Sequence, residues 1–480
     1  MMNGQQYRDS LKQLKPRVYF MGQQIENVVD HPATTPHVNC AAKIYEMAHD
    51  PQFEELFTAT SHLTGQKINR FTHIHQSTDD LLKKVKMMRA IGQQTASCFQ
   101  RCVGFDALNA VYQISYELDR AKGTNYHQRF LEYLKMVQDR DLMPSGAMTD
   151  PKGDRSLSPS QQADPDLHVH VVARRENGIV VRGAKAQITG SVNSHEHIVM
   201  PTVALKEGEE DYAVSFAVPV DAPGVLHIFG RQTNDDRKCA ACAIDVGNPE
   251  FGIVGGEALI VFEDVFVPWE RVFLCGEVDF AYPLVERFAT FHRQNYGGCK
   301  TGLGDVLIGA TSALADIQGT GKAAHVREKI AEMIHLNETL YCCSIACSSQ
   351  GYKTASGAYY PDPLLANVTK QNVTRFIYEI ARLAHDITGG IMATLPSEQD
   401  LKDPVLGKYV EKYYKGVADV PTEDRIRLIR LIEAMTCGTA LVESMHGAGS
   451  PQAMRIMIQR QANLEHKKRL AKKLAGVTSK

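Results

Sequence analysis

The sequence has little net charge and no long apolar run, and both shortages narrow the possible functions. Its 480 residues carry a formal net charge of only −2, so the sequence lacks the excess of positive charge that is typical of proteins that bind nucleic acid or an anionic membrane. No stretch of about eighteen apolar residues is present, and the polar N-terminus lacks the apolar core of a secretory signal. We therefore expect a cytoplasmic protein with neither a nucleic-acid nor a membrane partner.

Common nucleotide-binding motifs and internal repeats are also missing. The sequence contains neither a Walker A motif nor a G-x-G-x-x-G motif after a strand, which disfavours P-loop and Rossmann folds. The eleven cysteines are an odd number spread over a long chain, which argues against a disulfide framework and for a reducing compartment.

The order of sequence patterns predicts an α+β protein with three domains. Residues 1–145 are mostly helical in pattern, 146–278 are rich in short strands typical of a small barrel or sandwich, and 279–480 form long helices typical of a bundle. Bundle helices are expected over 283–317, 323–349, 363–392 and 423–447. The basic amphipathic end, 455–480, is typical of a surface or subunit-docking helix.

Two pairs of potential metal ligands stand at helical spacing. His292 and Cys299 are seven residues apart, and Cys98 and Cys102 are four apart, so each pair would share one helical face. Two such helices facing each other would bring three thiolates and one imidazole together, which suits a metal or iron–sulfur site. The glycine pair 297–298 is expected to interrupt the second helix.

Spacing alone leaves other thiol pairs open. Cys343 and Cys347 are also four residues apart, and Cys239 and Cys242 have the more familiar C-x-x-C spacing of metal and redox sites. Free cysteine is often a small buried apolar residue, so any of these pairs can be structural.

A polar segment follows the first helical region. Residues 143–162 are rich in Pro, Gly, Ser and Asp. The segment is either a linker or a loop that wraps a cofactor with backbone N–H groups, hydroxyls and Arg155.

Several motifs spread over the chain resemble one family. They are Thr95–Gly104, Gly146–Arg155, Val180–Lys185, Asn193–His197, His292–Lys300, His335–Cys343 and Glu443–Pro451. Together they resemble the 4-hydroxybutyryl-CoA dehydratases, which share an architecture with the flavin-dependent 4-hydroxyphenylacetate 3-monooxygenases and the acyl-CoA dehydrogenases. The resemblance implies an acyl-CoA dehydrogenase-like fold and a homotetramer. It also implies FAD, a 4Fe–4S cluster and a CoA-thioester substrate, with dehydration of 4-hydroxybutyryl-CoA to crotonyl-CoA and Δ-isomerisation of vinylacetyl-CoA.

The implied chemistry explains why a redox-neutral dehydratase would keep a flavin. The β hydrogen of the substrate is not acidic, and one-electron oxidation of an enolate would acidify it through a radical. The cluster would act as a Lewis acid toward the substrate hydroxyl.

The resemblance also assigns residues. The cluster ligands are expected to be Cys98, Cys102, His292 and Cys299, with His292 either a fixed ligand or a base that leaves the iron. The FAD contacts are expected at Thr149, Lys152, Asp154, Arg155, Ser156, Gln187 and Thr189. His385, Asp386, Gly389 and Gly390 resemble an FAD-adenine turn, for which a helix C-cap is the alternative. The active-site lining is expected to comprise Gln100, Thr189, Glu257, His292, Tyr296, Lys300 and Glu443.

Two other functions stay open at this point. A flavin-dependent aromatic hydroxylase of the 4-hydroxyphenylacetate 3-monooxygenase type shares the fold but needs no cluster. A zinc-stabilised, non-catalytic helical assembly would use the thiols alone.

Overall fold

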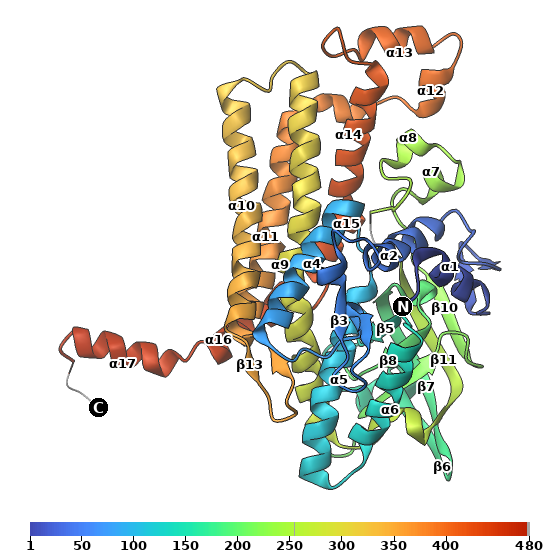
Figure 1. The fold of residues 1–480 in the computed structure, drawn as a ribbon, viewed down its shortest axis with the longest axis vertical. Helices are drawn as coiled ribbons and strands as arrows, with labels where there is room; N and C mark the ends of the chain where they lie inside the picture. Colours follow the sequence, from blue (N-terminus) through green and yellow to red (C-terminus); the bar gives the residue numbers. More distant parts are fainter. Residues whose placement is uncertain (254, 478–480) are drawn as a thin grey trace.

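A computed structural model describes residues 1–253 and 255–477 (Figure 1). The helices of the N-terminal region are α1 (Gly4–Lys12), α2 (Thr35–Met47), α3 (Glu54–Phe57), α4 (Thr78–Thr95), α5 (Arg101–Lys122) and α6 (Tyr126–Asp139). Between strands lie α7 (Asp235–Cys239) and α8 (Ala243–Val246). The later helices are α9 (Val278–Ile317), α10 (Ala324–Ser349), α11 (Pro363–Thr388), α12 (Glu398–Lys402), α13 (Gly407–Tyr413), α14 (Thr422–Thr436), α15 (Gly438–His446), α16 (Pro451–Gln461) and α17 (Leu464–Leu474).

Two sheets carry the β region. The first has the order β2 (Gln23–Ile25), β1 (Arg17–Phe20), β10 (Val225–Phe229), β11 (Glu257–Pro268), β7 (Gly178–Thr189) and β6 (His170–Arg175). The second has the order β12 (Val272–Cys275), β9 (Val214–Pro219), β8 (Glu196–Val199) and β5 (Pro144–Ala147). Short hairpins are formed by β3 (Thr58–Thr60) with β4 (Lys67–Asn69) and by β13 (Tyr352–Lys353) with β14 (Tyr359–Tyr360).

The two large sheets share one apolar core. Val181 of β7 and Ile260 of β11 are fully buried together with Phe216 of β9. Along the first half of β11 buried and less buried residues alternate, whereas β9 is buried along nearly its full length. Strands β1 and β2 come from the segment expected to be mostly helical. β1 pairs with β10 and β2 pairs with β1, so residues 17–25 form one edge of the first sheet. The domain boundaries near 145 and 278 stay a proposal.

Helix α9 runs without interruption for 40 residues, and the glycine pair 297–298 does not break it. A Cβ atom on Gly298 would lie 2.6 Å from the carbonyl oxygen of Val85 in α4. A Cβ atom on Gly297 would lie 2.8 Å from the carbonyl oxygen of Leu340 in α10. The glycines therefore allow two neighbouring helices to approach α9 closely, and this packing outweighs their low helix propensity.

The last two expected helices are each divided. Cys437 is extended (φ −76°, ψ 168°) and separates α14 from α15, so the single helix expected over 423–447 is wrong. Asn463 has φ 45° and separates α16 from α17, which extends away from the bundle in Figure 1. Among the described residues, no helix combines the length and apolar character that crossing a bilayer requires.

Candidate functional site

The three candidate thiol ligands come from two helices and the connection before one of them. Cys102 lies in the first turn of α5, whereas Cys98 lies in the non-helical segment between α4 and α5. The prediction that both share one helical face is therefore wrong. Ala96, with φ 48°, ends α4 before Cys98, and Gln100, with φ 68°, precedes α5, so Cys98 lies between the two helices. Cys299 on α9 packs against the same apolar cluster as Cys102.

The environment of these thiols disfavours free thiolates. Burial raises the pKa of Cys98 and Cys102 well above the ordinary value, and the charges of neighbouring thiols raise both further. Burial also raises the pKa of Cys299 to about 12, although Lys300 opposes the shift. Three thiolates could persist together here only with a strongly cationic partner, which is what a metal centre supplies.

The distances between candidate ligands determine whether they could bind a single metal ion. Within residues 1–253 and 255–477, no group of three or more His, Cys, Asp or Glu side chains stands close enough to hold a single metal ion. In a 4Fe–4S cluster each protein ligand binds a different iron, so the ligands stand further apart than around one zinc ion. A donor set of three sulfurs and one nitrogen is of the kind that binds iron–sulfur clusters, and its assignment to a cluster stays a proposal.

His292 lies on the α9 face that also carries Cys299, two turns away, as predicted. Its ring stacks on Phe288, with centroids 5.6 Å apart. Its Nδ1 atom lies 2.8 Å from Oδ2 of Asp106 on α5, which leaves Nε2 as the ring atom without this contact.

Glu443 on α15 is the centre of the polar lining. It accepts a hydrogen bond of 2.8 Å from the Tyr296 hydroxyl and pairs with Lys300, both on α9. Burial disfavours the ammonium of Lys300, yet Glu443 and the thiols raise the pKa of this lysine above its ordinary value. Burial likewise opposes the charge of Glu443, but Lys300 holds the pKa of this carboxyl below its usual range. The pair is therefore ionised at neutral pH.

Glu257 faces this cluster from the sheet. It begins β11, directly opposite Thr189 of β7, whose hydroxyl donates to its carboxylate over 3.3 Å. Gln232 donates to the second oxygen, also over 3.3 Å. Burial and the charge of Glu443 raise the pKa of Glu257 to about 7, so this group can gain or lose a proton near neutrality.

Gly255 lies next to both Cys98 and Thr189, the last residue of β7. A Cβ atom there would lie 2.6 Å from Cγ2 of Thr189 and 2.9 Å from Sγ of Cys98. Only glycine permits this approach, so the end of β7 and the thiol lie side by side. Gln100 is adjacent, but its amide donates to the carbonyl oxygens of Cys98 and His37 at 3.3 and 3.5 Å. It therefore supports the backbone around the thiols.

Lys370 on α11 is a site residue that the sequence reasoning missed. Its Nζ lies 4.1 Å from the ring centroid of Tyr296 and donates to the carbonyl oxygens of Ser444 and Met445 in α15. Burial lowers the pKa of Lys370 to about 7, and Lys300 adds to the effect. The available signal was a lysine on the buried face of a helix, at helical spacing from Ala366 and Val373.

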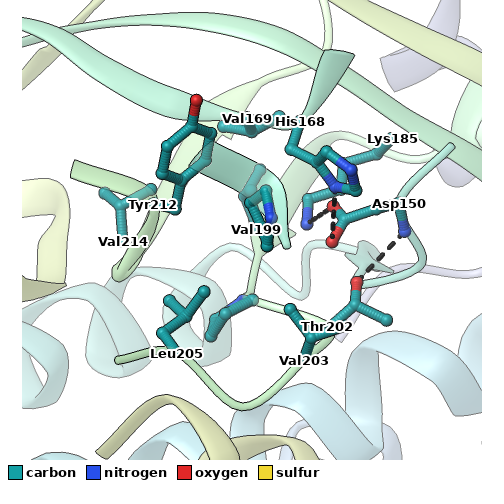
Figure 2. Close-up of a pocket in the computed structure, with 12 residues that line it drawn as sticks. Asp150, His168, Val169, Lys185, Val199, Thr202, Val203, Leu205, Tyr212 and Val214 are labelled. Atoms are coloured by element: carbon teal, nitrogen blue, oxygen red, sulfur yellow. Dashed lines mark hydrogen bonds and ion pairs between the residues drawn. The ribbon is translucent and has the colours of Figure 1, made fainter. Parts of the chain in front are cut away.

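The expected FAD loop is anchored at its start. Lys185 of β7 pairs with Asp150 and donates to the carbonyl oxygens of Met148 and Met200, at 2.9 and 2.7 Å. Figure 2 shows Asp150 between Lys185 and His168, with its backbone N–H donating to the Thr202 hydroxyl over 3.0 Å. Four expected FAD contacts that follow this anchor are exposed and available to a ligand: Lys152, Asp154, Arg155 and Ser156. Gln187 in β7 is exposed as well.

The second expected FAD segment has the geometry of a helix end. Gly389, with φ 78°, follows the last residue of α11, and its N–H donates to the carbonyl oxygen of His385. The His385 ring contacts the Thr436 hydroxyl at 2.7 Å, and Asp386 pairs with Lys329. These contacts lie within the helical bundle and fit the interpretation of this segment as a helix C-cap. A role of the segment, including Gly390, in binding FAD stays a prediction.

An apolar cavity adjoins the charged cluster. It is partly open to solvent and has Lys300 and Glu443 in its wall. The other walls are mostly aliphatic and come from α9, α11, α14 and α15: Leu303, Leu307, Ile377, Ile380, Met435 and Ala440. This combination suits an aliphatic chain that carries a polar reacting end.

Comparison with known proteins places these residues in a family. The N-terminal and C-terminal models of 4-hydroxyphenylacetate 3-hydroxylase match residues 3–274 and 281–476. The 4-hydroxybutyryl-CoA dehydratase/vinylacetyl-CoA-Δ-isomerase of Clostridium aminobutyricum is 57% identical, over 99% of this chain and 100% of that protein.

Solved structures agree with this placement. An oxygen-tolerant archaeal 4-hydroxybutyryl-CoA dehydratase from N. maritimus has a TM-score of 0.97 and 51% identity, covering 100% of this chain and 95% of that one. The oxygenase component HpaB in complex with FAD has a TM-score of 0.85 and 26% identity, covering 99% and 98%. An acyl-CoA dehydrogenase from Slackia heliotrinireducens, at 13% identity and a TM-score of 0.51 over 81% and 82%, shares the fold alone and confirms the predicted fold class. The chain belongs to the 4-hydroxyphenylacetate 3-hydroxylase family and is similar over its full length to 4-hydroxybutyryl-CoA dehydratases.

Proposed function

We propose that this protein dehydrates 4-hydroxybutyryl-CoA to crotonyl-CoA and also isomerises vinylacetyl-CoA, with FAD and a 4Fe–4S cluster as cofactors. The observation that carries the proposal is the placement of one buried thiol (Cys102), two partly buried thiols (Cys98 and Cys299) and His292 near the Glu443 cluster, beside an apolar cavity. The 57% identity to a dehydratase of this kind supports the choice of reaction. The homotetramer and the cytoplasmic location stay predictions.

The residues that would hold the two cofactors come close together at Gly255, where Thr189 and Cys98 are neighbours. Cys98, Cys102, Cys299 and His292 would hold the cluster, while the loop 149–156 with Gln187 and Thr189 would hold FAD. When bound, the flavin supplies one-electron chemistry and the cluster supplies a Lewis acid for a hydroxyl group.

The reaction balance explains why several titratable groups line the site. Dehydration removes one proton from the α carbon and one from the β carbon. It delivers one proton to the γ carbon and one to the departing hydroxide, so no electrons are gained or lost overall. Glu257 and Lys370 both titrate near neutrality, and Tyr296 stays protonated because burial and Glu443 raise its pKa. These side chains can therefore accept and return the protons close to the reacting carbons.

The cavity would hold the acyl end of the thioester. Its aliphatic walls suit the carbon chain, while Lys300 in its wall and Tyr296, which shares the Glu443 carboxylate, offer donors to an oxygen atom. These donors are already oriented by Glu443, so binding costs little reorganisation.

The pH profile should report on Glu257. If its carboxylate accepts a substrate proton, kcat/KM should rise about tenfold per pH unit below its pKa of about 7 and level off above it. Glu257→Gln should abolish this rising limb, because the amide cannot take the proton. Glu263→Gln, on the same strand but paired with Arg17 at the surface, is the control and should leave the profile unchanged. A rising limb that survives in Glu257→Gln would assign it to another group.

Flavin retention should depend on Arg155. We expect Arg155→Ala to weaken FAD binding by about 10- to 100-fold, because a charge-assisted hydrogen bond contributes about 1.5–3 kcal/mol. The measurement is the flavin absorbance that remains after dialysis. Arg174→Ala, which removes an exposed arginine paired with Asp211, is the matched control. Equal flavin content in the two variants would refute the placement of FAD at this loop.

Cofactor content separates the proposal from its alternatives. Anaerobically purified protein should contain iron, acid-labile sulfide and flavin together. Flavin without iron would favour an aromatic hydroxylase, as in the HpaB relatives, and zinc without flavin would favour a structural role.

A further inference from the structure

Asp106 is a buried carboxylate to which no role has yet been assigned. It lies on α5 one helical turn after Cys102, and its side chain is 1% exposed. It faces two residues of α9 and one of α4: His292, Asn295 and Lys84.

Every contact of this carboxylate is with a hydrogen-bond donor or with the imidazole. Oδ1 lies 2.7 Å from Nζ of Lys84, and Oδ2 accepts from the amide of Asn295 and lies 2.8 Å from Nδ1 of His292. Lys84 is itself completely buried and also donates to the carbonyl oxygen of Phe291 and to Gln294, at 3.1 and 3.2 Å. This lysine therefore ties Asp106 to both neighbouring helices.

The ion pair decides which ring nitrogen carries the proton. A carboxylate paired with an ammonium group can only accept hydrogen bonds, so Nδ1 of His292 must be the donor. In the neutral ring the lone pair then lies on Nε2. Metal-bound histidines are commonly fixed in this way by a carboxylate behind the ring.

We infer that Asp106, held by Lys84, is a positioning residue that fixes the tautomer and the orientation of His292 so that Nε2 is free to bind iron. This inference rests on the proposed function, because it requires the cluster. Since Cys102 and Asp106 share one face of α5, the same helix would place a thiolate ligand and orient the imidazole ligand.

The test is a double-variant cycle on the anaerobically purified holoenzyme. Asp106→Asn, combined with Lys84→Met to avoid an unpaired buried ammonium, should lower iron and sulfide content and weaken the nitrogen hyperfine coupling of the reduced cluster. Outer partners of metal ligands commonly change metal affinity by about 10- to 100-fold, so most of the cluster should be lost on mild chelation.

Repeating the Asp106→Asn and Lys84→Met changes in a His292→Cys background distinguishes the positioning of His292 from a purely structural role of the ion pair. A thiolate has no tautomer to fix, so the Asp106/Lys84 change should have little further effect on iron retention there. Equal loss of iron in both backgrounds would overturn the inference, as would an unchanged nitrogen coupling in the His292 protein.

A second ion pair between the same helices supplies the control. Arg89 of α4 pairs with Asp305 of α9 at 2.8 Å, and neither contacts His292. Asp305→Asn with Arg89→Met should keep the wild-type nitrogen coupling. Wild-type protein that contains no iron would refute the proposed function itself, a result distinct from failure of the cycle.

Discussion

Replacing Cys102 with serine is expected to remove most of the bound iron and all measurable dehydration. The serine hydroxyl is a poor substitute for a thiolate, and loss of one ligand opens an iron–sulfur cluster to solvent and oxidation. Because Cys102 is 5% exposed and packs in the core of the helices, the substitution is not expected to change the surface of the protein. Iron and sulfide analysis of the purified variant, together with its visible absorbance, gives the measurement.

Cys347 provides the matched control for this experiment. It is completely buried on α10, and its thiol donates to the carbonyl oxygen of Asp362 over 3.3 Å, a bond that serine can also make. Cys347→Ser should therefore keep its iron. Equal iron loss in the two variants would show that the choice of ligands is wrong.

Replacing Glu443 with glutamine should damage both activity and stability. The change leaves Lys300 buried without its counter-ion, and breaking a buried pair in this way costs about 3–5 kcal/mol. Activity should fall by at least about 100-fold, because Tyr296 and Lys300 lose the group that orients them. Chemical denaturation and steady-state assays of the loaded enzyme provide the two readouts.

Two further variants separate orientation from stability. Glu443→Gln combined with Lys300→Met should recover much of the stability, since no buried charge is left unpaired, but none of the activity. Glu423→Gln alters an exposed glutamate paired with Arg427 and should cost less than about 1 kcal/mol. Full activity in Glu443→Gln would remove this residue from the catalytic lining.

The sequence did not predict the local structure around the candidate ligands. Helical spacing suggested one face for Cys98 and Cys102, but left-handed backbone at Ala96 and Gln100 places Cys98 outside any helix. The glycine pair in α9 was expected to break the helix, and packing against α4 and α10 keeps it intact. Local propensity cannot anticipate either outcome, because contacts distant in sequence decide both.

Long-range partners explain the other differences. Lys370 and Glu443 are 73 positions apart and meet only after α11 and α15 fold against α9. Likewise, the family motifs indicated the loop 149–156, but nothing local revealed that Lys185 anchors it through Asp150. Motifs therefore indicated candidate site residues, whereas the tertiary structure was needed to find their partners.

The most direct test of the central claim is conversion of 4-hydroxybutyryl-CoA by the wild-type holoenzyme under anaerobic conditions, without any added electron donor or acceptor. We predict that crotonyl-CoA accumulates with one water released per substrate, and that vinylacetyl-CoA gives the same product without release of water. Protein that contains its full iron, sulfide and FAD and leaves both thioesters unchanged would contradict the account.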